Sequence, residues 1–341
     1  MANIDDVAKM AGVSKGTVSN VFSKKRPIGP KVTERVLSVA KELGYYPNHV
    51  ARSLAIKKTM IIGLKMPLFK KREMSGLEVQ MITGVIKECS MLGYRVLLDT
   101  LPEHDDVTQF SADPVDGVIL LNPRENDVRI ERFRQMGIPL VLVGRPEPNL
   151  GDISYVDNNN TEMAFQVGDY LLNMGHQSIL FLNASSDMTV SKDRENGLSQ
   201  AFRQRGLELQ SDYVINYSRM LHASASEYGY MVVASTYKSL KYTAVIADTD
   251  RVALGAMRAA RELGLEIPED LSIIALSNDA ALAQETTPRL TSVELEAEQL
   301  GAEAAKLVMQ MINDSNALSQ KIVNTRLIVR ESCRAYIGAE R

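Results

Sequence analysis

The apolar positions of the first 45 residues recur at helical spacing in three short stretches. The first stretch begins at Asn3, a residue type that can cap a helix, and is interrupted at Gly12. The second follows Ser14, and the third starts with Pro30, which is tolerated in the first turn of a helix. This pattern predicts a compact head of three helices within residues 1–47.

From Met60 onward, short apolar runs alternate with amphipathic stretches of helical length. The strand-like runs are Ile61–Met66, Val96–Leu98, Val115–Leu121, Pro139–Val143, Ile179–Leu182, Ala244–Ala247 and Leu271–Leu276. The helical stretches are Gln80–Leu92, Thr161–Met174, Lys192–Arg205, Ser226–Ser239, Arg251–Leu263 and Glu294–Asn313. This alternation predicts parallel sheets covered by helices on both faces, and the number of strands predicts two sheets and therefore two subdomains. The expected fold class is an all-α head followed by an α/β body.

The charge of the chain is unevenly distributed. Its net charge is −3, yet residues 1–58 contain 11 Lys and Arg against 4 Asp and Glu, so a basic head is followed by an acidic body. Phosphate contacts require such a basic surface, although a solvated surface without a partner would give the same composition. The two cysteines, Cys89 and Cys333, match no metal or redox spacing and are expected to be reduced thiols. No signal peptide or membrane span is visible, so we expect a cytoplasmic protein.

Two short helices joined by a turn that contains Gly12 are typical of a helix-turn-helix. In this motif the second helix enters the major groove, and residues near its amino end reach the base edges. Any small helical hairpin would show the same generic pattern, so the spacing alone does not settle DNA binding.

The residues themselves are more specific than the pattern. The head contains IDDVAKMAGVSKGTVSNVF, then VTERVLSVAKELGYYPNHVARSL, and a hydrophobic strand MIIGLKM follows. In these segments the chain resembles the LacI/GalR family of transcription regulators, and later motifs extend the resemblance over essentially its full length. The body resembles the type I periplasmic-binding-protein fold, in which two lobes close on a ligand.

The resemblance implies three parts: a head of residues 1–47, a hinge helix of residues 48–58, and an effector-binding and dimerisation body of residues 59–341. It also implies that the chain crosses between the lobes three times, and we expect these crossings near Asp157, Thr287 and Leu318. One lobe would then comprise residues 59–156 and 288–318, and the other residues 157–287 and 319–341. In the hinge, Leu54 would be a wedge between base steps in the minor groove, although a plain linker is the alternative.

The expected DNA contacts lie at the start of the second helix, in the basic loop after it and in the hinge. They are Ser14, Lys15, Gly16, Thr17, Ser19, Asn20, Lys24, Asn48, Ala51 and Leu54. Lys15 and Gly16 occupy the positions that usually discriminate between operators. Lysine could bind guanine, whereas Gly16 has no side chain with which to read a base. The operator sequence therefore stays open.

Effector contacts are expected beyond the carboxyl ends of the strands, where open α/β sheets bind ligands. In the segment Asp248-Thr249-Asp250, the family carries an acidic residue at the position of Asp250 that commonly contacts the effector. An N-cap carboxylate or a divalent-metal pair would explain the same residues. No metal site is assigned.

Four further residues are candidates for the effector site. Arg194 matches the R-x-x-G motif whose arginine lines the family's cleft, and the alternative is a surface arginine. Asp157 falls at the expected lobe crossing, where an ordinary turn would also favour it. Asn122 and Arg145 come just after two predicted strands.

The sequence therefore predicts a ligand-controlled transcription regulator, acting as a repressor on a pseudo-palindromic operator. We expect a homodimer, no cofactor, and an effector that is a sugar. A solute-binding transport protein would share the body but has no use for a basic helical head. A sugar-metabolising enzyme would need catalytic residues, and no catalytic motif is visible.

Overall fold

The computed structural model describes residues 2–23, 26–45, 58–66, 74–99, 114–147, 150–218, 221, 224–314 and 317–338. The chain separates into two compact units, Met1–Met60 and Ile61–Arg341, here called the head and the body. None of the described helices is long and apolar enough to cross a membrane.

The head contains three helices, α1 (Ile4–Met10), α2 (Lys15–Ser23) and α3 (Pro30–Glu42). Asn3 and Asp6 form a capping box at the start of α1, and Gly12 adopts φ +61° in the turn that follows. Val7, Val18 and Val36, one from each helix, are fully buried in a shared core. The predicted order and positions of the three helices are confirmed.

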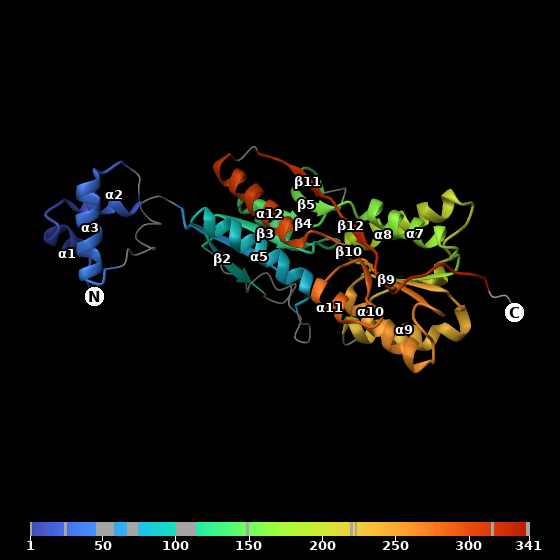
Figure 1. Ribbon diagram of the computed structural model, residues 1–341. Coiled ribbons are helices and arrows are strands. Elements are labelled where there is room, and N and C mark those ends of the chain that lie inside the picture. The colour runs from blue at the N-terminus through green and yellow to red at the C-terminus, as the bar shows by residue number, and fades with distance from the viewer. Residues whose placement is uncertain are drawn as a thin grey trace. The chain divides into compact units, whose positions relative to one another are not determined.

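The body contains two six-stranded sheets (Figure 1). The first has the order β11-β5-β4-β3-β1-β2, and the second has the order β12-β10-β9-β8-β6-β7. The strands of the first are β1 (Ile61–Lys65), β2 (Arg95–Asp99), β3 (Gly117–Leu121), β4 (Leu140–Val143), β5 (Ser154–Asn158) and β11 (Gln320–Val323). Those of the second are β6 (Ile179–Asn183), β7 (Val214–Asn216), β8 (Ala244–Ala247), β9 (Ser272–Ala275), β10 (Thr291–Glu294) and β12 (Arg326–Ile328). All described pairings are parallel except that of β12 with β10.

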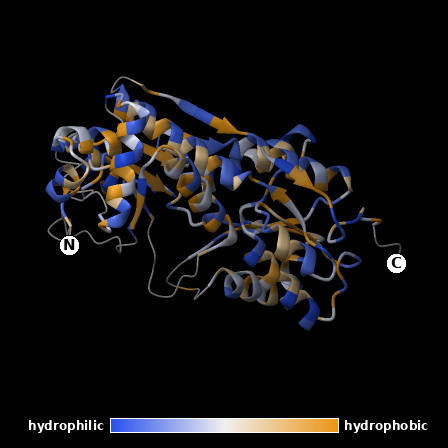
Figure 2. Cartoon of the chain, turned by 60° about the vertical axis from the view of Figure 1, so that its left-hand side comes forward, coloured by the Kyte–Doolittle hydropathy of each residue, from blue (hydrophilic) through white to orange (hydrophobic). Residues whose placement is uncertain are grey.

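Helices cover both faces of each sheet. In the first lobe α5 (Gly76–Met91) and α12 (Ala297–Asn313) pack side by side on one face, and α6 (Val128–Gln135) packs on the other (Figure 1). The second lobe has α7 (Asn160–Asn173) and α8 (Thr189–Gln204) on one face, and α9 (Ala225–Leu240), α10 (Asp250–Glu262) and the short α11 (Ala280–Glu285) on the other. A 3₁₀ turn, Ser211–Tyr213, precedes β7. The helices carry both hydrophobic and hydrophilic residues (Figure 2), as helices with one buried side must.

The structure corrects two of the three expected lobe crossings. β10 still belongs to the second sheet and β11 still belongs to the first, so the crossings follow Glu294 and Val323 rather than Thr287 and Leu318. Both strands escaped detection because neither is a continuous apolar run. β10 contains Thr291 and Ser292, and most of the edge strand β11 is exposed or half-buried. The remaining crossing follows Asn158, the last residue of β5.

Glycines allow the paired helices of each lobe to approach closely. A Cβ atom at Gly84 of α5 would lie 1.9 Å from the Glu298 carbonyl oxygen of α12, and one at Gly301 of α12 would lie 2.0 Å from the Met81 carbonyl oxygen of α5. The contact between α9 and α10 is built in the same way. Between α7 and α8, a Cβ atom at Gly197 would lie 2.0 Å from the Thr161 carbonyl oxygen. The atoms approached are backbone, which cannot swing aside.

Replacing Gly197 with alanine is therefore expected to lower the unfolding free energy by about 2–3 kcal/mol, because α7 and α8 must separate. Chemical denaturation of the full chain would measure this loss. Glu195→Ala, an exposed position on the same helix, is the matched control. If the gain in helix propensity from Gly to Ala outweighed the steric cost, Gly197→Ala would be more stable than the wild type, and the close contact would lose its importance.

Candidate functional site

The amino end of α2 presents most of the expected DNA contacts at the surface of the head. Ser14, Lys15, Gly16 and Ser19 are exposed, and Thr17 and Asn20 are partly exposed. The Ser14 hydroxyl caps the helix by accepting a hydrogen bond from the Thr17 N–H at 3.1 Å. It also lies 3.0 Å from the Thr17 hydroxyl. The other four expected contacts, Lys24, Asn48, Ala51 and Leu54, lie outside the described residues.

An ion pair occupies the start of this helix. The Lys15 ammonium binds the carboxylate of Asp5, which lies in the first turn of α1. A Cβ atom on Gly16 would meet only the Ser14 hydroxyl, at 3.7 Å, so the space beside Lys15 is open. The surface at the amino end of α2 thus combines the Lys15 cation, the carboxylate of Asp5 from α1, and small hydroxyl groups.

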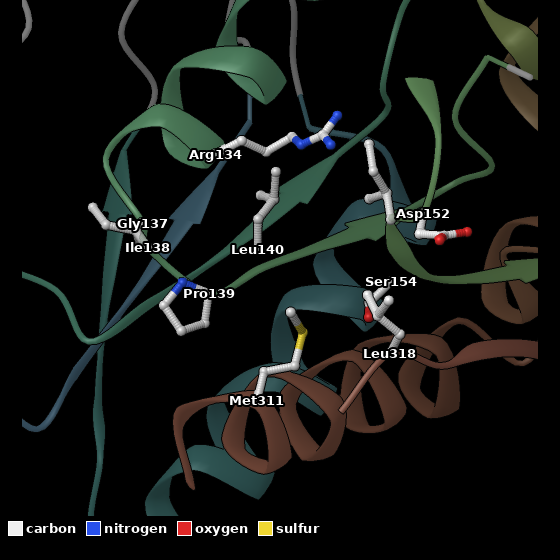
Figure 3. Close-up of a pocket in the computed structure, with 10 residues that line it drawn as sticks. Arg134, Gly137, Ile138, Pro139, Leu140, Asp152, Ser154, Met311 and Leu318 are labelled. Carbon is white, nitrogen blue, oxygen red and sulfur yellow. The ribbon is translucent and has the colours of Figure 1, made fainter. Parts of the chain in front are cut away.

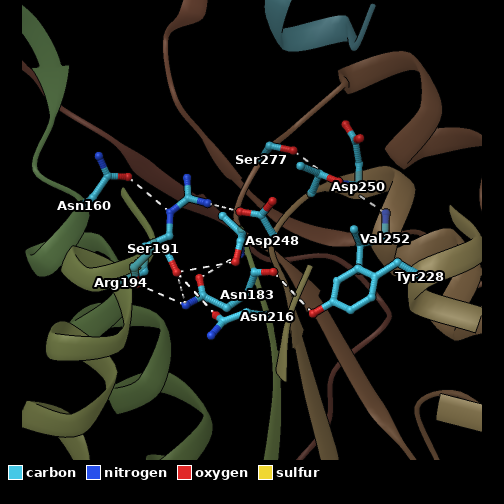
Figure 4. Close-up of polar contacts among 12 residues, drawn as sticks. Asn160, Asn183, Ser191, Arg194, Asn216, Tyr228, Asp248, Asp250, Val252 and Ser277 are labelled. Atoms are coloured by element: carbon cyan, nitrogen blue, oxygen red, sulfur yellow. Dashed lines mark hydrogen bonds and ion pairs between the residues drawn. The ribbon is translucent and has the colours of Figure 1, made fainter. Parts of the chain in front are cut away.

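In the body, the carboxyl ends of the two sheets supply a second group of polar residues. Arg194, on α8, is its centre: the side chain is buried, its Nη1 atom pairs with the carboxylate of Asp248, and its Nε atom donates to the Asn160 Oδ1 atom at 3.2 Å (Figure 4). The Asn160 Nδ2 atom in turn donates to the Asp157 Oδ1 atom at 3.1 Å. One continuous network therefore joins the end of β5 in the first lobe to the end of β8 in the second.

A neighbouring amide cluster belongs to the second lobe alone. The Asn183 Nδ2 atom donates to the Ser191 Oγ atom at 2.9 Å, and that hydroxyl donates to the Asn216 Oδ1 atom at 3.3 Å (Figure 4). Tyr217 lies at the end of β7, with its ring centroid 5.5 Å from that of the buried Tyr228. Amide groups beside an aromatic face can bind a polyhydroxylated ligand through its hydroxyls and its apolar C–H surface.

Asp250 has a different environment from Asp248. Its carboxylate is buried and accepts the Arg251 N–H at 2.7 Å and the Asp279 N–H at 2.9 Å, while Thr249 caps α10. Burial is the main cause that raises the pKa of the Asp250 carboxyl. This carboxylate braces the start of α10 against the loop after β9, and Asp248 is the acidic residue that binds Arg194.

The two lobes touch along one side of the cleft. Arg145, after β4, donates from its Nη2 atom to the carboxylate of Asp193, and its carbonyl oxygen accepts the Thr189 hydroxyl at 2.8 Å. Farther along, Arg124 pairs with Asp187 at 3.3 Å. Further links include the Glu125 N–H donating to the Asp187 carbonyl oxygen at 2.9 Å and the Lys192–Glu125 ion pair. The two lobes are therefore joined by direct contacts between the chain's own residues.

Close packing also joins the lobes at the start of α5. A Cβ atom at Gly76 of the first lobe would lie 2.4 Å from the Asp279 Oδ2 atom of the second lobe. Asn122 also lies close to the start of α5, because its Nδ2 atom donates to the Oε1 atom of Glu78 on that helix at 3.3 Å. The structure thus brings Asp157, Arg145 and Arg194 into connected polar networks, and it places Asn122 and Asp250 in separate ones.

Burial changes the ionisation of the carboxyl groups in the network. Asp157 has its pKa raised to about 6 by burial, against the opposing effect of the N–H groups of Asn158 and Arg145, which it accepts. Burial likewise raises the pKa of the Asp193 carboxyl, and the Arg145 guanidinium opposes that rise. The charge of this part of the cleft therefore depends on pH in the weakly acidic range.

Asp157→Asn tests this effect. The folded protein holds a proton on Asp157 more tightly than the unfolded chain does, so the stability contributed by protonation is complete below pH 4 and is lost as the pH rises through about 6. Asparagine does not ionise, so the unfolding free energy of the variant relative to the wild type should rise between pH 4 and pH 7. Denaturant titrations at these two pH values measure the difference, and parallel pH profiles would contradict the raised pKa.

A separate hollow of the first lobe lies at the amino ends of its strands, opposite to the polar network around Arg194 (Figure 3). It has a volume of about 200 Å³ and is lined at the amino ends of β4 and β5 by Leu140 and Ser154, with Met311 of α12 and Leu318 beside them. Because the polar network around Arg194 lies at the carboxyl ends of the strands, this hollow is not part of it. Among the described residues, no group of three or more His, Cys, Asp and Glu could hold a metal ion.

Several residues of the network were not predicted individually. Asn183 directly follows a predicted strand, so the rule that located Asn122 would also have selected it. Asp248 lies in the segment that this rule did locate, but it was not chosen over Asp250. Asn160 is the first residue of α7 and Asp193 lies on α8, and only the fold brings them to Arg194 and Arg145. Cys89 is buried, with its pKa raised to about 12 chiefly by that burial, as a structural thiol would be.

Comparison with known proteins gives two family matches. The model described as bacterial regulatory proteins, lacI family, matches residues 3–48, and the model described as a periplasmic binding protein-like domain matches residues 169–333. The HTH-type transcriptional regulator CelR of Thermobifida fusca is 30% identical over 347 residues, which cover 96% of this chain and 97% of CelR. A probable HTH-type transcriptional repressor of Bacillus subtilis, ExuR, is 29% identical over 341 residues, covering 98% of this chain and 99% of ExuR.

Solved structures give the same result. The complex of the transcriptional regulator CelR with cellobiose superposes with a TM-score of 0.73 at 27% sequence identity, over 97% of this chain and 100% of that one. The Lac repressor bound to ONPG in its repressed state superposes with a TM-score of 0.81 at 21% identity, over 97% and 99% of the two chains. The second likeness is one of fold, and the relatives found by sequence are regulators of transcription rather than enzymes.

Proposed function

The chain belongs to the LacI family of DNA-binding transcriptional regulators, and from this premise we propose that it is a repressor whose affinity for its operator is set by a sugar bound between the lobes of the body. The observation that carries the proposal is the network from Asp157 through Asn160 and Arg194 to Asp248, which spans the carboxyl ends of both sheets. A ligand that engages this network contacts both lobes at once and can therefore report its presence to the rest of the chain.

We propose a sugar because of the groups that the cleft offers. Carboxylates accept from hydroxyls, guanidinium groups donate to them, and the side-chain amide of Asn216 can do both. The relative whose structure contains cellobiose has the same fold over the whole chain. The proposed contacts are Asp157, Arg194, Arg145, Asn122 and Asp250, together with Asp248.

On the DNA side, the proposed contacts are Ser14, Lys15, Gly16, Thr17, Ser19 and Asn20, with Lys24, Asn48, Ala51 and Leu54 in segments outside the described residues. One small head contacts few base pairs, so useful affinity requires two heads on one assembly. We therefore propose a homodimer on a pseudo-palindromic operator. Such a regulator works where the chromosome lies, in the cytoplasm, and needs neither a cofactor nor catalysis.

Closure of the lobes would couple the two activities. The chain passes between the lobes three times, so a sugar that favours one lobe arrangement also changes how the first lobe is presented to the segment that leads to the head. The effector must then change the affinity for the operator by the same factor by which the operator changes the affinity for the effector. This coupling is typically about 1–3 kcal/mol.

Selection from a randomised duplex library with the full chain, followed by titration of neutral sugars against the selected duplex, tests this function. We expect an inverted-repeat operator, binding that weakens steeply with salt, and at least one sugar that changes operator affinity by about fivefold or more. The proposal would be wrong if no duplex were enriched. It would also be wrong if every sugar that bound the protein left operator affinity unchanged.

A further inference from the structure

We propose that Asp5 is a specificity-determining residue for DNA: it holds Lys15 at the amino end of α2 and presents its own carboxylate to the same base pairs. The inference rests on the proposed DNA-binding function and adds to it a residue outside the recognition helix. Asp5 lies on α1, the helix that a helix-turn-helix does not insert into the groove.

The geometry that carries the proposal is the ion pair between the two helices. The Lys15 ammonium binds the Asp5 carboxylate, and the two side chains are 63% and 53% exposed. The Asp5 N–H donates to the Asn3 Oδ1 atom at 2.7 Å, so the backbone that carries the carboxylate is fixed by the helix cap. Exposed ion pairs contribute little to folding stability, so stability alone gives little reason for this pair.

At the amino end of α2, the residues beside Lys15 have no free polar side chain for reading bases, so this role falls to the Lys15–Asp5 pair. Gly16 has no side chain, and the hydroxyls of Ser14 and Thr17 are hydrogen-bonded to each other. Within residues 14–17, Lys15 is the one charged side chain, and it reaches any partner with Asp5 attached. The surface at the amino end of α2 thus presents a cation, Lys15, and an anion, Asp5 of α1, side by side.

Such a pair distinguishes sequences in two ways. An isolated lysine would bind any phosphate, whereas a carboxylate beside it is repelled by phosphates and reduces sequence-independent binding. At the base edges, guanine offers O6 and N7 as acceptors for Lys15, and cytosine offers an N4 amino group as a donor to Asp5. The best match is therefore a guanine for Lys15 with a cytosine amino group in the same or the adjacent base pair.

The experiment applies library selection and affinity measurement to the full chain and its variants. We expect Asp5→Asn to lose the preference for guanine and cytosine at one position of each half-site by about fivefold or more. It should also bind unselected DNA more tightly than the wild type does. Glu34→Gln removes the same charge from an exposed site on α3 and should leave the sequence preference unchanged, and Asp5→Glu should keep it. In a Lys15→Gln background, Asp5→Asn should cause a smaller loss of preference than in the wild type, because only the cytosine contact of Asp5 is left to lose.

The outcomes separate cleanly. An unchanged preference in a folded Asp5→Asn variant, or an equal effect from Glu34→Gln, would overturn the proposal, because neither depends on the pair. If Asp5→Asn does not fold by circular dichroism, Asp5→Glu and the single variant Lys15→Gln decide in its place: loss of the preference in Asp5→Glu, or an unchanged preference in Lys15→Gln, overturns the proposal. A wild-type chain that enriches no duplex would overturn the proposed DNA binding itself, and this inference with it.

Discussion

Replacing Arg194 with methionine is expected to abolish the effector response and to lower the unfolding free energy by about 3–5 kcal/mol. The reason is that Arg194 and Asp248 form a nearly buried pair, with side chains 8% and 18% exposed. Removing the guanidinium removes the ion pair of Arg194 with the Asp248 carboxylate and breaks the link through Asn160 to Asp157. Denaturant unfolding measures the first effect, and operator affinity with and without the sugar measures the second.

A second substitution separates the two effects. In Arg194→Met with Asp248→Leu, both members of the nearly buried ion pair are replaced by apolar side chains, so most of the lost stability should return while the effector response stays absent. Arg203→Met, at an exposed position of the same helix, is the matched control and should change neither quantity. A single Arg194→Met variant with wild-type stability would show that the pair does not hold the cleft. An intact response in the double variant would remove both residues from the effector site.

The fold of the head could be read from its sequence because its determinants are local. Caps such as Asn3, the turn glycine Gly12 and a single apolar stripe per helix each act within a few residues. The resulting core contains Val7, Val18 and Val36, all on the predicted faces.

In the body, the strands that form apolar runs could be predicted, including the edge strand β2, and the other strands could not. Strands such as β3 and β8 are buried on both faces and therefore read as continuous apolar runs. β7 and β12 are short and only partly buried, and β5 ends in Asp157 and Asn158, so none of the three produces such a run. The strands β10 and β11 were also missed, and each of them directly precedes a crossing between the lobes. Two of the expected crossings were therefore placed too early in the chain.

The same distinction applies to the effector site. The rule that ligands bind beyond strand ends located Asn122, Arg145 and the Asp248–Asp250 segment, whereas Asp157 was selected at the expected lobe crossing. It could not choose between Asp248 and Asp250, since that choice depends on Arg194, which reaches only one of them from a helix 54 positions earlier in the chain. Pairings of this kind are set by tertiary structure and have no counterpart in local sequence.

Asn158→Asp is the second substitution with a large expected effect. The Asn158 side chain is buried at the first crossing, and its Nδ2 atom donates to the Leu295 carbonyl oxygen at 3.1 Å and to the Val323 carbonyl oxygen at 2.9 Å. These two carbonyl groups lie at the other two crossings, so one amide group ties together all three strands that connect the lobes. The lobes can move relative to one another only about a point that this side chain helps to define.

Aspartate has nearly the same shape as asparagine but presents acceptors where the amide presented a donor. Both carbonyl groups would lose their hydrogen bond and face a carboxylate, so the unfolding free energy should fall by about 3 kcal/mol or more. The loss should be greater at pH 8 than at pH 5, because the folded variant favours the protonated carboxyl. Asn159→Asp is a matched control at the next residue: Asn159 is exposed and caps α7, a role that aspartate also fills, so stability should change by less than about 0.5 kcal/mol. Equal effects of the two substitutions would mean that the contacts of Asn158 do not hold the crossings together. A large loss confined to Asn158→Asp, accompanied by a weaker effect of the sugar on operator affinity, would instead locate the pivot of lobe closure at this side chain.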